Sequence, residues 1–194
     1  MSIGKHGVTA ESAKNILFGA GTFHKNLKRD DVTGKWSGTC VGATKGGGKI
    51  SVKGEYQDLE VDGALVKFKG QTVKVGGTAN MEVNITELSA DNIKLAGNFK
   101  EGESDVDGYA MFVDKPNIEE GDYLENFGFV GKTADGTKDI IVIFDYALCT
   151  SAFELEATHK GQSVLKAVLE AYADPTSDLD TLPVKIYYPT VATV

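Results

Sequence analysis

The most constraining feature of this sequence is a strict alternation of apolar and polar side chains over residues 79–86. The apolar positions, followed by the polar positions between them, are Ala79, Met81, Val83, Ile85 and Asn80, Glu82, Asn84, Thr86. Successive side chains of a β-strand point to opposite faces, so this period of two predicts a strand with one buried face and one polar face. Such a strand needs neighbouring strands to cover its apolar side.

Further runs of β-forming residues predict the rest of the sheet. We expect strands at residues 16–23, 50–59, 65–70, 71–75, 109–113, 123–131, 138–148, 152–158 and 183–188. Asp-Gly pairs supply the positive φ angles of tight turns, so Asp62-Gly63 and Asp135-Gly136 predict hairpins, and Gly76-Gly77 predicts another reversal. Residues 138–148 are apolar on both faces, which is typical of a strand covered on both sides.

A single short helix is expected directly after the alternating strand. Ser89 can accept hydrogen bonds from the free amides of a first turn, Asp91 suits the positive end of the helix dipole, and Gly97 can end the helix. Ile93 and Leu95 are the side chains that we expect to pack the helix against the sheet.

The composition favours one domain that is mainly β. No proline-rich or low-complexity linker divides the 194 residues, and 23 glycines against 4 prolines accompany many short strands. We expect a β-sandwich or open barrel over residues 1–194, with one short α-helix packed on the sheet. Its irregular parts are expected to be a polar N-terminal arm at 1–15, a glycine-rich loop at 42–49 and an acidic loop region at 98–122.

Charge and cysteine content argue against several functional classes. Acidic side chains outnumber basic ones by 28 to 20, which opposes nonspecific attraction to nucleic acid. Cys40 and Cys149 are too far apart in sequence for a metal knuckle, and we expect both to be reduced core residues. The N-terminus has no apolar signal core, and no run approaches the roughly 20 apolar residues of a membrane span. We therefore expect synthesis in the cytoplasm without a signal peptide, and no membrane partner.

No motif predicts an enzyme. The segment from Gly42 to Lys49 differs from a phosphate-binding loop, because Ala43 stands where the first glycine belongs and Ile50 where the hydroxyl belongs. The three histidines are scattered along the chain, and the usual hydrolase, zinc and dinucleotide motifs are absent from the sequence. We expect no catalytic residues, no cofactor and no metal.

Several short motifs follow one another in an order that is found in a known family. They are Leu17-Phe18-Gly19-Ala20-Gly21-Thr22, Gly46-Gly47-Gly48-Lys49, Val61-Asp62-Gly63-Ala64, Val73-Lys74-Val75-Gly76, Met81-Glu82-Val83-Asn84 and Val184-Lys185-Ile186-Tyr187-Tyr188-Pro189. In this order they resemble the major tail proteins, or tail tube proteins, of long-tailed bacteriophages.

The resemblance implies a structural virion protein that assembles into stacked hexameric rings. In that family each subunit gives about four strands to an inner barrel, through which genomic DNA passes without specific binding. The implied partners are further copies of the chain and the tape measure, tail initiator and tail terminator proteins. The resemblance also favours a strand at residues 162–173, although their local propensity favours a helix.

Two sets of residues follow as candidate sites. The polar face of the alternating strand is the candidate lining of the lumen, which we expect to be net negative so that DNA can slide: Asn80, Glu82, Asn84 and Thr86. The resemblance implies that loops near the glycine-rich segment join stacked rings, and the candidate contacts there are Gly42, Lys45, Gly46, Gly47, Gly48 and Lys49.

An alternative from another class is a monomeric ligand-binding or carbohydrate-binding β-sandwich. It explains the same strands, and it gives a use to the aromatic pair Tyr187-Tyr188 near the C-terminus. It predicts a stable monomer with a saturable small-molecule site, whereas the tube hypothesis predicts self-association.

Overall fold

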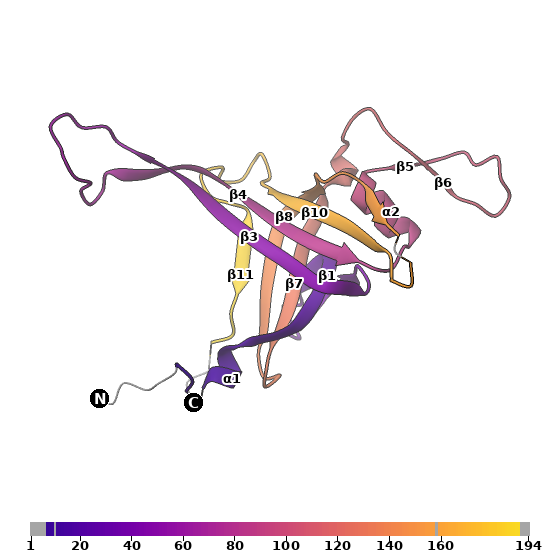
Figure 1. Ribbon diagram of the computed structural model, residues 1–194, viewed down its shortest axis with the longest axis horizontal. Coiled ribbons are helices and arrows are strands. Elements are labelled where there is room, and N and C mark those ends of the chain that lie inside the picture. The colour runs from indigo at the N-terminus through magenta and orange to yellow at the C-terminus, as the bar shows by residue number, and fades with distance from the viewer. Residues whose placement is uncertain (1–6, 10, 158, 191–194) are drawn as a thin grey trace.

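The protein is mainly β, as expected from its sequence. A computed structural model describes residues 7–9, 11–157 and 159–190, and Figure 1 shows the arrangement of the chain. The elements are α1 Ser12–Asn15, β1 Leu17–Arg29, β2 Trp36–Cys40, β3 Thr44–Asp58, β4 Thr72–Ile85, α2 Ala90–Gly97, β5 Lys100–Gly102, β6 Met111–Val113, η1 Glu120–Asp122, β7 Leu124–Thr133, β8 Asp139–Cys149, β9 Glu154–Glu156, β10 Val164–Tyr172 and β11 Val184–Tyr187.

One large antiparallel sheet of nine strands dominates the fold. Its order is β2-β1-β7-β8-β10-β4-β3, with β9 added to β10 and β11 added to β8, while β5 and β6 form a separate two-stranded ribbon. Strand β8 pairs with β7 along one edge, and along the other edge it pairs first with β11 and then with β10. The sheet curls on itself, so that β1 faces β3 across the interior (Figure 1).

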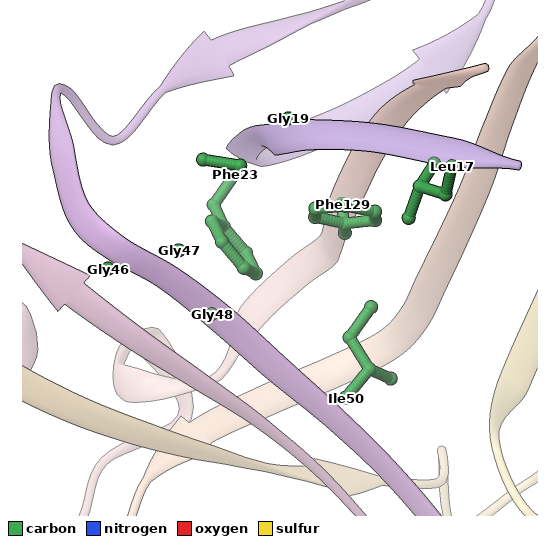
Figure 2. A pocket seen from close by; sticks show the side chains of 9 residues that line it. Leu17, Gly19, Phe23, Gly46, Gly47, Gly48, Ile50 and Phe129 are labelled. Atoms are coloured by element: carbon green, nitrogen blue, oxygen red, sulfur yellow. The ribbon is translucent and has the colours of Figure 1, made fainter. Parts of the chain in front are cut away.

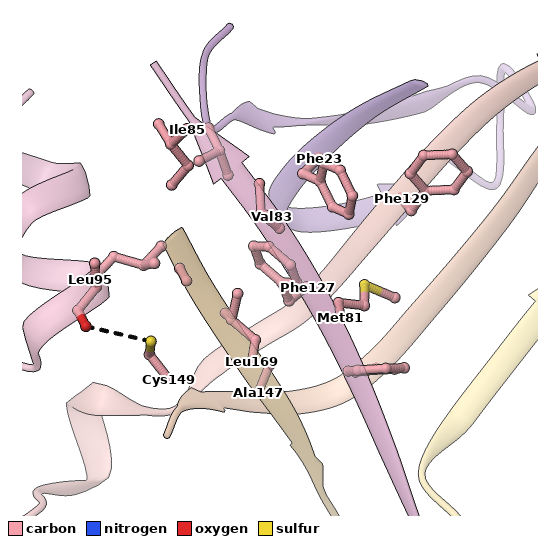
Figure 3. Close-up of a cluster of buried hydrophobic side chains, with 14 of the residues drawn as sticks. Phe23, Met81, Val83, Ile85, Leu95, Phe127, Phe129, Ala147, Cys149 and Leu169 are labelled. Carbon is pink, nitrogen blue, oxygen red and sulfur yellow. Dashed lines mark hydrogen bonds between the residues drawn. The ribbon is translucent and has the colours of Figure 1, made fainter. Parts of the chain in front are cut away.

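The core fills the space that the curled sheet encloses. The rings of Phe23 and Phe129 lie 5.2 Å apart, and Phe127 stacks on Phe23 at 6.3 Å. Figure 3 shows these rings against the buried side chains of β4, which include Met81 and Val83. Strands distant in sequence therefore share one apolar cluster, which is the main source of stability in a fold of this kind.

The alternating pattern of β4 is confirmed. Its apolar positions are buried from Ala79 to Ile85, whereas the polar positions between them are half-buried. Residues 164–172 form a strand, as predicted, with Leu165, Ala167 and Leu169 buried. Packing in the sheet therefore prevails over the helical propensity of this segment.

Strand β8 is covered on both faces, as its sequence predicted. Val142 and Phe144 belong to the main core, whereas Ile141 and Ile143 pack with Leu27 in a second apolar cluster on the opposite face. The hairpin between β7 and β8 turns at Asp135 and Gly136, where Gly136 has a φ of 69°. Both features were predicted from the sequence.

The predicted strand at 65–70 and the predicted turn at Gly76-Gly77 are wrong. Residues 59–71 form the loop at the end of a long β3–β4 hairpin, and β4 runs through both glycines without reversing. The glycines there serve close approach: a Cβ atom on Gly77 would lie 2.7 Å from the Lys53 carbonyl oxygen. A glycine pair in a strand can mark such a contact as well as a turn.

The glycine-rich segment is also not a loop. Strand β3 begins at Thr44, and its pairing with β4 shifts register between Thr44 and Gly48. Gly46 and Gly47 have φ angles of 76° and 73°, which a bulge requires and which favour glycine. The loop expected at 42–49 is therefore wrong from Thr44 onward, where the chain forms an irregular stretch of strand.

Replacing Gly48 by alanine is expected to lower the free energy of unfolding by about 2–3 kcal/mol. The new Cβ atom would lie 2.5 Å from the Glu82 carbonyl oxygen and would also overlap the Phe23 ring. Urea denaturation should show this loss, whereas Gly121→Ala, where no atom lies within 4 Å of the added Cβ, should stay within about 0.5 kcal/mol of the parent. Equal midpoints for the two variants would contradict this account of Gly48.

Three smaller expectations are corrected. The segment expected as a polar arm contains the short helix α1, and only residues 7–9 and 11–15 of it are described. The cysteines are both free thiols, but only Cys149 is in the core while Cys40 is exposed. Of the strand expected at 152–158, the described residues 152–157 form only the three-residue strand β9, whose side chains are exposed.

Candidate functional site

A long hairpin extends away from the body of the sheet. Figure 1 shows β3 and β4 continuing together beyond the other strands to a broad loop. We call residues 55–75 the hairpin arm. None of its residues is buried, and its large apolar side chains are exposed: Tyr56, Leu59, Val61, Leu65, Val66, Phe68, Val73 and Val75. Leu65 is 98% exposed and Val66 is 79% exposed.

The loop of the hairpin arm is held by its own hydrogen bonds. Leu59 N–H donates to the Gln71 carbonyl at 2.9 Å, and the Gln71 amide nitrogen Nε2 donates to the Leu59 carbonyl at 2.8 Å. Asp58 pairs with Lys67 and accepts from Thr72 Oγ1 at 2.6 Å. The hydrogen bonds that Asp58 accepts from Lys67 and Thr72 lower the pKa of its carboxyl below the usual value, and the one from Lys67 has the larger effect. The loop is thus organised before it meets any partner, which reduces the entropy cost of binding.

Two edges of the large sheet are open among the described residues. Strand β3 ends the strand order on one side and β2 ends it on the other. Strand β3 pairs with β4 along one edge, and its other edge presents a row of free backbone donors and acceptors over the length Thr44–Asp58. Proteins usually cover or shorten such edges. The backbone groups of this edge can bind a strand from another chain.

The predicted lumen residues lie together on the polar face of β4, with Thr86 just after the strand. The strand register places residues of β3 and β10 opposite them: Lys49, Ser51, Lys166, Val168 and Glu170. Lys166 Nζ lies 3.2 Å from a carboxylate oxygen of Glu82. The face is polar, as expected, and its charged side chains are two lysines, Lys49 and Lys166, and two glutamates, Glu82 and Glu170. These four charges balance within one subunit, and the net negative lumen of an assembled tube stays a prediction.

The predicted contact residues divide into two groups. Gly46, Gly47 and Gly48 line an apolar hollow of about 650 Å³ between β1 and β3, together with Phe23 and Phe129 (Figure 2). The other three candidates, Gly42, Lys45 and Lys49, do not line it. The hollow lies where the two ends of the curled sheet approach each other. Its described lining contains no charged side chain, so it can bind an apolar group but has no group for acid–base chemistry.

Helix α2 packs through one of the two predicted side chains. Leu95 is buried, whereas Ile93 is only half-buried. The sequence did not reveal Asn92, whose Nδ2 donates to the carbonyls of Val41 and Glu87 at 2.8 Å each. Asn92, Leu95 and Ala96 follow the three-to-four residue spacing of one helix face, and this spacing is the signal that would have identified them.

The helix begins where it was predicted to begin. Ser89 is its N-cap and accepts from Asn92 N–H at 3.2 Å. The helix does not end through Gly97, however, because Asn98 takes the left-handed conformation at the C-cap with a φ of 50°. Asparagine is the usual alternative to glycine at such a position.

Chemical groups that could hold a metal do not gather in the described part of the chain, where no three His, Cys, Asp or Glu side chains form such a cluster. Within the same residues no helix is both long and apolar enough to cross a membrane.

Comparison with models of known protein families found no match, and comparison with curated proteins found none either.

Proposed function

We propose that this protein assembles with copies of itself into stacked rings that form a hollow tube, as the tail tube subunits of long-tailed bacteriophages do. The observation that carries the proposal is the hairpin arm, which displays eight large apolar side chains that are between 37% and 98% exposed. Monomeric proteins rarely expose so many large apolar side chains on one segment, and such segments commonly mark contacts with other proteins.

The energy available from the hairpin arm is large enough for association. Full burial of one large apolar side chain contributes about 1.5–3 kcal/mol. The eight side chains are already partly covered, and burial of about half of each would contribute about 6–12 kcal/mol in all. This is comparable with the roughly 4–15 kcal/mol that association costs in lost translational and rotational freedom. The pre-organised loop adds little further cost, because its hydrogen bonds already exist in the free subunit.

The two open edges of the sheet differ from each other, so copies that join through them are all arranged head to tail. A contact between the β3 edge of one copy and a different edge of the next copy is heterologous, and such contacts close into a ring when the rotation between copies allows it. Six copies that each give about four strands, spaced about 4.8 Å and tilted about 40°, would enclose a barrel about 50 Å across. Such a barrel has room for duplex DNA.

Within this proposal the polar face of β3, β4 and β10 faces the lumen. Its charges are mixed, and the pairing of Lys166 with Glu82 removes one free cation from the path of a polyanion. The tape measure, initiator and terminator proteins would bind at the inside and at the ends of the tube, and the subunit would act in the virion rather than as an enzyme.

Sedimentation velocity over a concentration series tests the proposal. We expect species larger than a monomer whose share grows with concentration, because each subunit offers both an arm and an open edge. The alternative, a monomeric ligand-binding sandwich, predicts a single small species at every concentration and saturable binding of a sugar or another small molecule. The Tyr187-Tyr188 pair gives it little support, because Trp36 packs on Tyr187 at 4.9 Å and Lys138 lies over the Tyr188 ring.

A further inference from the structure

A second feature of the surface is a tyrosine-lined cavity, which we call the tyrosine pocket. Its volume is about 580 Å³, and it lies where the start of β7, the middle of β8 and the end of β10 meet. The rings of Tyr123, Tyr146 and Tyr172 line it, and those of Tyr123 and Tyr172 meet edge to face with centroids 5.3 Å apart. The three rings are half-buried, so they present aromatic surface to whatever enters.

The electrostatic character of the tyrosine pocket is negative. Its lining includes the carboxylates of Glu120 and Asp174 and, among the described residues, no lysine or arginine. The charge of Asp174, followed by burial and by the charge of Glu125, raises the pKa of the Tyr146 hydroxyl. Asp174 is itself kept ionised, because hydrogen bonds from Thr176 lower the pKa of its carboxyl.

Aromatic rings beside carboxylates are the surroundings that a cationic side chain prefers. The face of a tyrosine ring attracts an ammonium group through its quadrupole, and the two carboxylates add a direct charge attraction. The apolar parts of the rings also suit the hydrocarbon stem of a lysine or the apolar neighbours of a cation on the same segment. The ligand that fits is therefore a segment that combines a lysine with large apolar side chains.

The loop of the hairpin arm has this composition. Residues 65–69 read Leu-Val-Lys-Phe-Lys, and the side chains of Leu65, Val66 and Phe68 are exposed. Lys67 is already paired with Asp58, whereas Lys69 has no ion pair among the described residues. Figure 1 shows the arm projecting away from the strands that form the tyrosine pocket, so its loop is presented to another molecule.

We infer that the loop of the hairpin arm of one copy docks on the tyrosine pocket of a neighbouring copy, with the ammonium group of Lys69 between the tyrosine rings and the carboxylates of Glu120 and Asp174. The inference rests on the proposed self-assembly and adds the receptor for the arm. The apolar hollow beside Gly47 is a poorer receptor, because its described lining carries no charge to match Lys69. The contact joins two different surfaces, so each added copy still has a free arm or a free pocket for the next copy.

A charge exchange in the full-length protein tests this contact. Light scattering gives the protein concentration at which assembly begins for the parent, Lys69→Glu, Glu120→Lys and the double variant. We expect each single variant to raise this concentration about tenfold or more, and the double variant to return it to within about threefold of the parent. Glu120 is exposed, so the substitutions leave the core intact.

Two controls test whether the effect depends on the cation at position 69 or only on the net charge of the protein. Lys69→Arg retains the cation and should assemble like the parent. Lys100→Glu makes the same change of net charge at an exposed lysine on β5, and it should shift the threshold less than about twofold. A double variant that assembles no better than the single variants, or a Lys69→Glu variant that assembles like the parent, would overturn the contact.

The outcome separates this inference from the proposed function. If the parent assembles and the charge variants assemble equally well, self-association stands and only the tyrosine pocket is excluded as the receptor of the arm. If the parent stays monomeric at every concentration, both the proposed function and this contact are overturned.

Discussion

Replacing Leu65 and Phe68 together by aspartate is expected to abolish self-assembly while the subunit stays folded. Both side chains are exposed on the hairpin arm, and neither belongs to the core. Their loss therefore costs the monomer little, but it places two charges in the contact that we propose, where a carboxylate without a partner is strongly unfavourable. We expect the concentration needed for assembly, measured by light scattering, to rise more than about a hundredfold.

The matched control for this prediction is Val32→Asp. Val32 is 95% exposed in the turn between β1 and β2, so the variant makes the same kind of replacement, at one position, outside the arm. Both proteins should unfold in urea at the parent midpoint. A doubly substituted arm that assembles like the parent would remove the main support for the proposed function, and so would an equal loss of assembly in the Val32 variant.

Leu95→Asp is expected to destabilise the subunit by about 4 kcal/mol or more. The side chain is 8% exposed and belongs to the main core, where α2 closes the interior of the curled sheet beside Cys149 (Figure 3). Aspartate there loses the apolar contacts and leaves a charge without a partner. Denaturation in urea measures the loss.

Ile93→Asp is the comparison that tests the assignment of the helix face. Ile93 lies on the same helix but is only half-buried, so its carboxylate can reach water and the loss should be about 1 kcal/mol. From the sequence alone, the same large loss would have been expected at both positions. Equal losses at Leu95 and Ile93 would show that the packing of α2 described here is wrong.

Local patterns predicted the regular parts of this fold well. The alternation from Ala79 to Ile85 and the two apolar faces of residues 138–148 each reflect how a strand is buried, and both were confirmed. The turn at Asp135-Gly136 depends on backbone conformations that glycine permits, so a dipeptide is enough to predict it. In these cases the physical cause lies within a few residues of the pattern.

The errors arose where the cause lies far away in sequence. Gly48 is needed because Phe23 packs against it, and Gly77 because Lys53 lies beside it, so neither contact can be read from the glycines themselves. The tyrosine pocket was missed for the same reason, because its three rings come from separate segments of the chain. The neighbours of the candidate lumen residues could not be predicted either, because the register of β3 places Lys49 opposite Glu82 and that of β10 places Lys166 opposite Asn84.

Negative-stain electron microscopy of the purified full-length protein, with static light scattering on the same samples, tests self-assembly most directly. We expect rings or hollow tubes of uniform width, whose mass grows with protein concentration and which the doubly substituted arm variant fails to form. A single species of monomer mass at every concentration, without rings or tubes in the images, would contradict it.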